Sequence, residues 1–132
     1  MAGKKKNNNP AADSRKQLLE VALRLFAQKG YAATSIREIV DAAGTTAPSL
    51  YYYFGNKEGL YIELMQTHFA QFDSLLEPHL NPAEGARSRL QKLIDQFFSH
   101  VIEDQDFFRL MYTIYYGPPQ GAPFFDNTYF QP

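Results

Sequence analysis

The stretch that decides the fold is residues 35–57, which read SIREIVDAAGTTAPSLYYYFGNK. Ser35 and Glu38 form a capping box, the usual start of a helix. Gly44 then offers the left-handed stop that ends one. Thr46 can cap a second helix, with Pro48 tolerated in its first turn. The stretch therefore predicts two short helices joined through Gly44, the first burying the face formed by Ile36, Ile39, Val40 and Ala43.

Helical spacing continues on both sides of this pair. A capping box at residues 14–17 predicts a helix that ends at Gly30. Asn56 caps a fourth helix that ends at Pro78, and Asn81 with Pro82 begins a fifth. A sixth covers residues 106–116, and residues 117–123 form a Gly/Pro-rich loop. We expect an all-α fold of five or six helices. The inward residues of the fourth and fifth helices are predicted to be Leu60, Leu64, His68, Phe72, Leu75 and Leu76, and then Ala86, Leu90, Leu93, Ile94, Phe97 and Val101.

The composition limits the classes of protein to which the chain can belong. The chain has 132 residues, a mass of 15.1 kDa, 45% hydrophobic and 20% charged residues, and no cysteine. This indicates a globular protein without disulfides, thiolate metal sites or cysteine nucleophiles. No apolar run approaches the roughly 20 residues that cross a bilayer. The basic start is followed by asparagines and not by an apolar stretch, so a signal peptide is not expected. We expect a soluble cytoplasmic protein that makes no membrane contact.

The charge is unevenly distributed. Residues 1–57 hold nine Lys/Arg against four Asp/Glu, whereas residues 58–132 hold four against ten. Such a split indicates that the N-terminal part of the chain, residues 1–57, binds a polyanion and that the C-terminal part does not. The alternative is a solvated surface with a basic tail, because short basic runs are weak signals.

Two short helices joined by a tight turn, with a third helix before them, form a helix-turn-helix. The second helix of such a pair enters the major groove of DNA with its N-terminal residues leading. Here those residues are small or able to hydrogen-bond, which allows close approach to base edges. Arg37 is the long side chain placed to reach a guanine. The leading residues are Thr45, Thr46, Ala47, Pro48 and Ser49.

Helical geometry places the aromatic residues 51–54, at the end of this helix, on different faces of it. We expect Phe54 to pack inward with Leu50, and Tyr52 and Tyr53 to stay accessible. Their hydroxyls and the ammonium of Lys57 would contact phosphates. For Tyr51, packing and DNA contact are equally plausible.

Residues 26–44 (FAQKGYAATSIREIVDAAG) and 49–60 (SLYYYFGNKEGL) strongly resemble the TetR family of bacterial transcriptional regulators. Residues 1–13 are polar, basic and low in complexity, so we expect a disordered arm there. The resemblance implies a homeodomain-like DNA-binding domain over 14–58, and a helical domain from 59 to 132 that dimerises and binds a small effector. Gly59 departs from the pattern, where an acidic residue is usual, and should weaken the start of the fourth helix. The resemblance places DNA contacts at Lys4, Lys5, Lys6, Ser35, Arg37, Thr45, Thr46, Ala47, Pro48, Ser49, Tyr51, Tyr52, Tyr53 and Lys57.

The chain is shorter than the resemblance implies, so we expect it to lack the last helices of the regulatory domain. Many aromatic residues lie in 97–130, more than a sixth helix buries, which predicts a tendency to associate. The resulting interpretation is a ligand-responsive repressor that binds a palindromic operator as a homodimer. The alternative is a ligand- or partner-binding helical domain that does not bind DNA specifically.

Other chemistry has few candidates. His68 and His100, together with Phe97, Met111 and Tyr115, could line a pocket for an apolar or aromatic effector; alternatively, the histidines are structural. His100 and Asp104 are four residues apart, which indicates a local pair. No metal-ligand spacing, Gly-rich phosphate loop or catalytic set is recognisable. We therefore expect no cofactor, no metal and no enzymatic activity.

Overall fold

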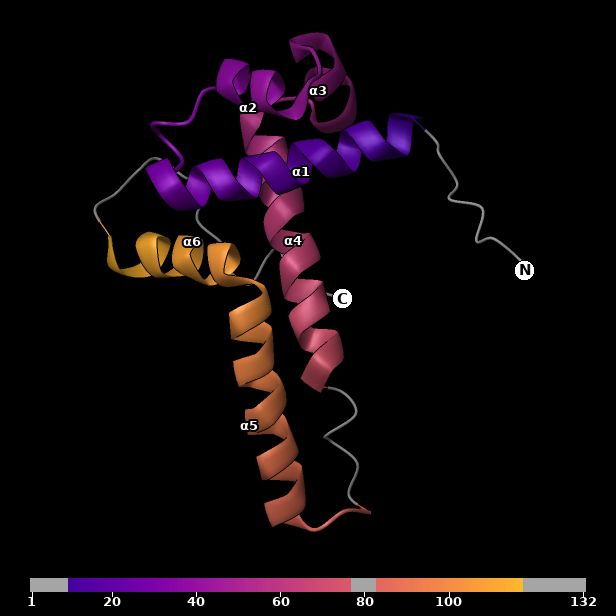
Figure 1. Cartoon of the computed structure of the whole chain (residues 1–132), viewed down its shortest axis with the longest axis vertical. Coiled ribbons are helices and arrows are strands. Elements are labelled where there is room, and N and C mark those ends of the chain that lie inside the picture. The colour runs from indigo at the N-terminus through magenta and orange to yellow at the C-terminus, as the bar shows by residue number, and fades with distance from the viewer. Residues whose placement is uncertain (1–9, 77–82, 118–132) are drawn as a thin grey trace, which may run out of the picture.

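The computed structural model describes residues 10–76 and 83–117, which form six helices and no strand (Figure 1). The all-α prediction is confirmed for this part of the chain. The helices are α1 (Pro10–Lys29), α2 (Ile36–Ala43), α3 (Ala47–Phe54), α4 (Lys57–Leu76), α5 (Ala86–Glu103) and α6 (Gln105–Tyr116).

The first helix begins earlier than predicted. α1 starts at Pro10, so the Ser14 capping box does not mark its start and residues 10–13 are helical, not part of an arm. Proline is tolerated in the first helical turn, two alanines follow it, and the carboxylate of Asp13 lies at the positive end of the helix dipole. These local preferences extend the helix by one turn. Lys4, Lys5 and Lys6 lie outside the described residues.

The helix-turn-helix forms as the sequence predicts. The Ser35 hydroxyl accepts a hydrogen bond from the Glu38 N–H at 3.1 Å, and Gly44 ends α2 with φ of 67°. The Thr46 hydroxyl accepts from the Ser49 N–H at 3.4 Å and caps α3. Together α1, α2 and α3 form the N-terminal unit that we call the headpiece. Its buried core takes residues from all three helices and contains Leu18, Ala22, Phe26, Ile39, Val40, Leu50 and Phe54.

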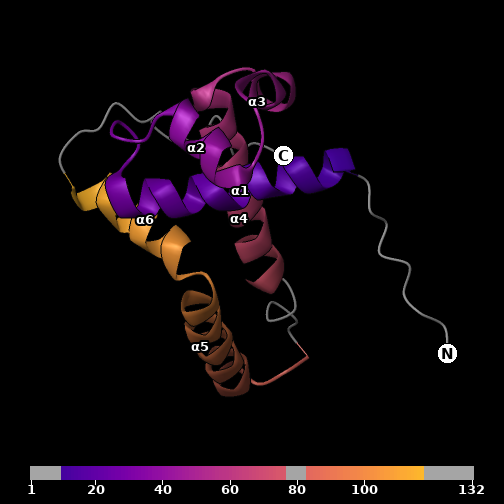
Figure 2. The same ribbon diagram turned by 45° about the horizontal axis from the view of Figure 1, so that its top comes forward.

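Two of the helices after the helix-turn-helix, α4 and α6, pack onto the same core. α4 leads away from the headpiece, α5 returns beside it, and α6 turns to lie along α1 (Figures 1 and 2). Phe107 and Leu110 of α6 are buried in the cluster that also holds the headpiece core. From α4 the cluster takes the predicted Leu60 and Leu64, and also Tyr61 and Met65. The core is thus continuous across the predicted domain boundary at residues 58 and 59.

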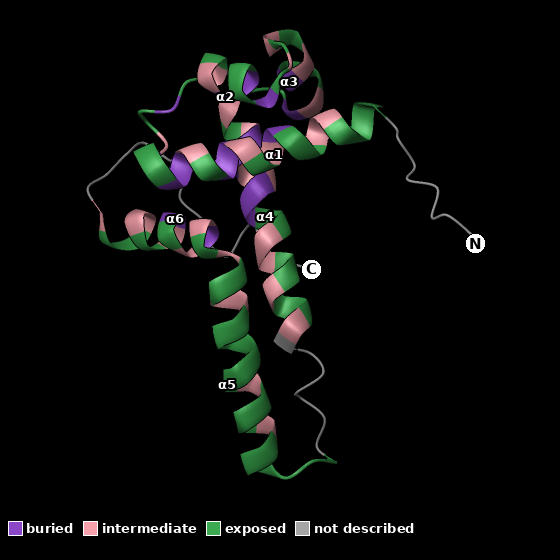
Figure 3. Ribbon diagram, in the orientation of Figure 1, coloured by how far each residue is buried: buried purple, intermediate pink, exposed green. Residues whose placement is uncertain are grey.

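The fifth helix differs from the prediction in two ways. It begins at Ala86 after the N-cap Gly85, without a side-chain cap, so it does not start at Pro82; Asn81 and Pro82 lie outside the described residues. The face predicted to be inward is also largely uncovered, and no residue of α5 is buried (Figure 3). The reason is tertiary: α5 contacts α4 on one side and meets α6 near its end, so no described helix covers the rest. Leu90, Ile94 and Phe97 are 57%, 44% and 39% exposed.

On α4, the lower part of the predicted stripe is only half-buried. His68, Phe72 and Leu75 lie beyond the shared core, where only α5 and the start of α6 are near. The side chain of Leu76 is not described.

Candidate nucleic-acid interface

The N-terminus of α3 is accessible and carries small side chains. Thr46 and Pro48 are exposed, and Thr45, Ala47 and Ser49 are half-buried. The Thr46 hydroxyl also lies 3.2 Å from the Ser49 hydroxyl, so the cap and its neighbour form one local unit. The first N–H groups of a helix point outward and carry partial positive charge. A nucleic-acid backbone or base edge can therefore approach this helix end closely.

Arg37 lies in the first turn of α2 and extends into solvent. Its side chain is 91% exposed, and its Nε lies 3.9 Å from the Asp41 carboxylate, the limit of an ion pair. Such an exposed pair holds the guanidinium weakly. Arg37 is therefore exposed and only weakly held, and its contact with a base edge stays a prediction.

The tyrosines of α3 are exposed to different extents. Tyr52 is 85% exposed and Tyr51 is 49% exposed, whereas Tyr53 is half-buried against the core. The prediction that Tyr52 stays accessible is confirmed, whereas Tyr53, which was also predicted to be accessible, is partly covered. At about 100° per residue, Tyr51 and Tyr53 flank the stripe of Leu50 and Phe54 equally, so the neighbouring helices decide which one is covered. The Tyr53 ring contacts those of Tyr52 and Phe54 at 5.3 and 6.2 Å.

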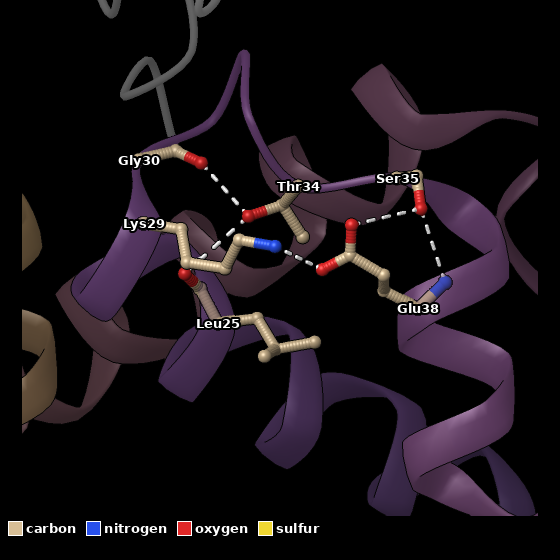
Figure 4. A network of polar contacts seen from close by, with 6 residues as sticks. All are labelled: Leu25, Lys29, Gly30, Thr34, Ser35 and Glu38. Atoms are coloured by element: carbon tan, nitrogen blue, oxygen red, sulfur yellow. Dashed lines mark hydrogen bonds and ion pairs between the residues drawn. The ribbon is translucent and has the colours of Figure 1, made fainter.

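A polar network holds the connection between α1 and α2 (Figure 4). The Thr34 hydroxyl donates to the carbonyls of Gly30 at 2.8 Å and Leu25 at 3.3 Å, which closes the C-terminus of α1. Lys29 pairs with Glu38 and, with the Ser35 hydroxyl, holds the pKa of that carboxyl below its usual range. Ser35 is thus engaged as a cap, and its contact with DNA would be through exposed atoms beside that cap.

Lys57, the first residue of α4, is placed by an aromatic ring. Its Nζ lies 4.1 Å from the centre of the Tyr31 ring, and partial burial lowers the pKa of the ammonium. Tyr31 lies in the turn after α1 and was not singled out from the sequence. The feature of the sequence that could have identified Tyr31 is its position directly after Gly30, within the motif of residues 26–44.

The residues predicted to line the effector pocket come together only in part. The Nδ1 of His68 lies 2.6 Å from an Asp104 carboxylate oxygen, and its ring stacks on Phe107 at 4.8 Å. The predicted pairing of His100 with Asp104 is therefore wrong, because Asp104 ends α5 and turns toward α4. The rings of Phe97 and His100 both contact Phe72 and Phe108, at centre distances of 5.8–6.1 Å.

The other two predicted effector residues lie further along α6. Met111 packs against the core, one turn beyond Phe107. Tyr115 is 57% exposed, and after burial and Tyr31 it is the third cause that raises the pKa of the Tyr61 phenol. Neither lines the apolar groove between α4 and α5, which has a volume of about 260 Å³ and is lined by Phe72, Leu93, Ile94, Phe97 and Phe98.

The described residues hold no cluster of three or more His, Asp or Glu side chains placed to bind a metal ion. Among the helices over residues 10–76 and 83–117, none combines the length and apolarity that a membrane span requires.

The fold and the accessible N-terminus of α3 define a helix-turn-helix protein. A family model described as "Bacterial regulatory proteins, tetR family" matches residues 18–64. The chain belongs to this TetR family, as the sequence motif predicted.

Individual relatives extend the similarity. The transcriptional activator FasR of Mycolicibacterium smegmatis is 33% identical over 117 residues, which are 88% of this chain and 53% of that protein. The transcriptional repressor KstR2 of Mycobacterium tuberculosis is 36% identical over 91 residues, 66% of this chain and 44% of that protein. A solved TetR-like transcriptional regulator from Rhodococcus sp. RHA1 superposes with a TM-score of 0.69 at 26% identity, covering 75% of this chain and 54% of that one. This chain thus spans about half the length of these relatives.

Proposed function

We propose that the protein is a sequence-specific DNA-binding transcriptional regulator. The observation that carries the proposal is the accessible, small-residue N-terminus of α3, capped by Thr46 and flanked by the exposed Arg37 and Tyr52. In this arrangement α3 enters the major groove, Arg37 reads a base, and Tyr51, Tyr52 and Lys57 contact phosphates. Tyr53 contributes mainly by packing.

The regulator acts as a homodimer on a palindromic operator. Two headpieces then occupy successive major grooves, roughly 34–36 Å apart. The relatives include a named activator and a named repressor. We propose repression, relieved when an effector changes the spacing of the two headpieces so that both half-sites are no longer engaged together.

The effector is an apolar or aromatic small molecule. The groove between α4 and α5 is lined by apolar side chains alone, which suits such a molecule. Beside it, the Nε2 of His100 is buried and has no hydrogen-bond partner among the described residues. A polar group on the effector that reached this nitrogen would satisfy it.

The test is selection of duplexes from a random pool, followed by binding measurements between about 50 and 200 mM salt. A selected duplex should bind more tightly than an unrelated one, with affinity falling steeply as salt rises. Arg37→Ala should relax the preference at one base pair at a cost of about 1–3 kcal/mol, whereas Lys57→Ala should weaken all sequences alike. Arg87→Ala on α5, far from the headpiece, is the matched charge control.

The second candidate is a helical domain that binds a ligand or partner and does not recognise DNA. The uncovered apolar face of α5 favours it. Binding that is absent, or equal for every duplex and unaffected by Arg37→Ala, would favour this candidate and contradict the regulator.

A further inference from the structure

The position of Lys57 is electrostatically unfavourable within the chain itself. It is the first residue of α4, so its ammonium lies at the positive end of that helix dipole. Partial burial removes hydration and lowers the pKa of the ammonium. Neither effect stabilises a cation, and neither supplies a negative charge that would neutralise it.

Four other basic side chains of α1 and α2 have an acidic partner. Arg15 pairs with Glu63, Lys29 with Glu38, Lys16 with Glu20, and Arg37 approaches Asp41. Within the described part of the chain, no carboxylate lies within ion-pair distance of Lys57. Its close partner is the face of the Tyr31 ring, 4.1 Å from the ring centre. An aromatic face attracts a cation without neutralising it, so the net charge stays available to an external anion.

Tyr31 is itself held in place by two buried rings. Its ring centre lies 5.1 Å from that of Tyr61 in α4 and 5.4 Å from that of Phe26 in α1. Those two rings also contact each other at 5.9 Å, and both are fully buried. Tyr31 therefore forms a fixed platform. A lysine held over it has already lost rotamer freedom that a free lysine side chain would lose on binding a phosphate.

We infer that Tyr31 is a positioning residue for DNA binding, which holds the Lys57 ammonium uncompensated and ready for a backbone phosphate. The inference rests on the proposed function. It predicts that the contribution of Lys57 to DNA affinity depends on the aromatic face of residue 31 and not on its hydroxyl.

The test measures binding of a mixed-sequence DNA duplex as a function of salt, because phosphate contacts are independent of sequence. The variants are Tyr31→Phe, Tyr31→Leu, Lys57→Ala and the double variant Tyr31→Leu/Lys57→Ala. Lys57→Ala should reduce the salt slope by about 0.9, equivalent to roughly a threefold smaller loss of affinity between 50 and 200 mM salt. Tyr31→Leu should lower the slope in the same direction, and Tyr31→Phe should retain the wild-type slope.

The double variant separates positioning from general destabilisation. Tyr31→Leu should cause no further loss of affinity in the Lys57→Ala background, because the interaction is already absent. The NMR resonances of the Lys57 ε-methylene protons should also be shifted upfield by the ring in wild type and Tyr31→Phe, and lose that shift in Tyr31→Leu. This readout requires no DNA and shows whether the folded variants hold the lysine.

Four results would overturn the inference. Additive losses in the double variant would show that Tyr31 acts through stability alone, and a gain in affinity with Tyr31→Leu would show that the ring withholds the ammonium. If the wild type binds duplex and Tyr31→Leu leaves the salt slope unchanged, the inference is wrong, but the proposed function as a regulator is unaffected. Failure of the wild type to bind any duplex would instead remove the proposed function, and the inference with it.

Discussion

At the scale of single residues, Thr34 shows how one hydroxyl stabilises the headpiece. It is 1% exposed and donates to two carbonyls at the end of α1, those of Gly30 and Leu25. Thr34→Val keeps the shape but removes both hydrogen bonds from a buried site, which should lower the free energy of unfolding by about 1–3 kcal/mol. Urea denaturation measures the loss.

Thr67 is the matched control for Thr34. Its hydroxyl donates to the Glu63 carbonyl at 2.8 Å, but on the exposed side of α4. Thr67→Val should change stability by less than about 0.5 kcal/mol. Equal effects of the two substitutions would contradict the role assigned to burial at Thr34.

Tyr61 should make the fold sensitive to alkali. It is fully buried, and burial, together with the nearby Tyr31 and Tyr115, raises the pKa of its phenol above the ordinary value of 10.0. The folded state thus holds this proton more tightly than the unfolded state. Its stabilising effect is complete below about pH 10 and is lost as the pH rises further, by up to about 1.4 kcal/mol per pH unit.

Urea unfolding at about pH 8 and pH 11 checks this pH dependence. Tyr61→Phe keeps the ring and removes the titrating proton, so it should flatten the loss of stability at high pH. Tyr52→Phe alters an 85% exposed phenol and should leave the pH dependence as it is. A Tyr61→Phe variant with the wild-type alkaline loss would show that another group is responsible.

At the scale of elements, the junction of α3 and α4 depends on close backbone approach. A Cβ atom at Gly59 would overlap the carbonyl oxygen of Phe54, the last residue of α3. The N–H of Gly59 also donates to the Asn56 side chain at 2.6 Å, which caps α4. The glycine that seemed to weaken the helix start therefore allows α4 to begin directly behind α3.

Gly59→Ala should destabilise the protein by about 1–3 kcal/mol, because a neighbouring backbone cannot yield as a flexible side chain can. Gly85→Ala, at the start of α5, is the comparison: no heavy atom lies within 4 Å of its added Cβ, and its φ is −59°. It should cost less than about 1 kcal/mol. Thermal or urea unfolding that ranks the two variants the other way would contradict this account of the junction.

At the scale of the whole molecule, stability and association depend on different surfaces. Buried residues concentrate where α1–α4 and α6 meet, whereas α5 exposes an apolar face (Figure 3). Phe107 is 2% exposed and Phe98 is 60% exposed. Phe107→Ser should therefore cost about 3–5 kcal/mol, whereas Phe98→Ser should leave the free energy of unfolding nearly unchanged.

The same pair of variants tests association. Wild type should sediment as larger species as its concentration rises and should bind a hydrophobic dye, and Phe98→Ser should reduce both effects. A wild-type protein that remains monomeric at all concentrations and binds no dye would contradict the role of the α5 face in association.

The sequence by itself determined the features that depend on residues within about four positions of one another. The caps at Ser35, Thr46 and Asn56, the stop at Gly44 and the inward pair Leu50 and Phe54 all appear as predicted, because capping bonds and helical periodicity are local. The same motif also identified the family.

The tertiary structure decided which surfaces meet. It left Tyr53 half-buried and Tyr51 more exposed, although both flank the same helical stripe. It paired Asp104 with His68 in α4 and not with its neighbour His100, left the periodic apolar face of α5 uncovered, and set Lys57 over Tyr31. Each of these outcomes joins residues far apart in the chain or on different elements. Local pattern predicts that a face is apolar, but only the arrangement of the helices determines what covers it.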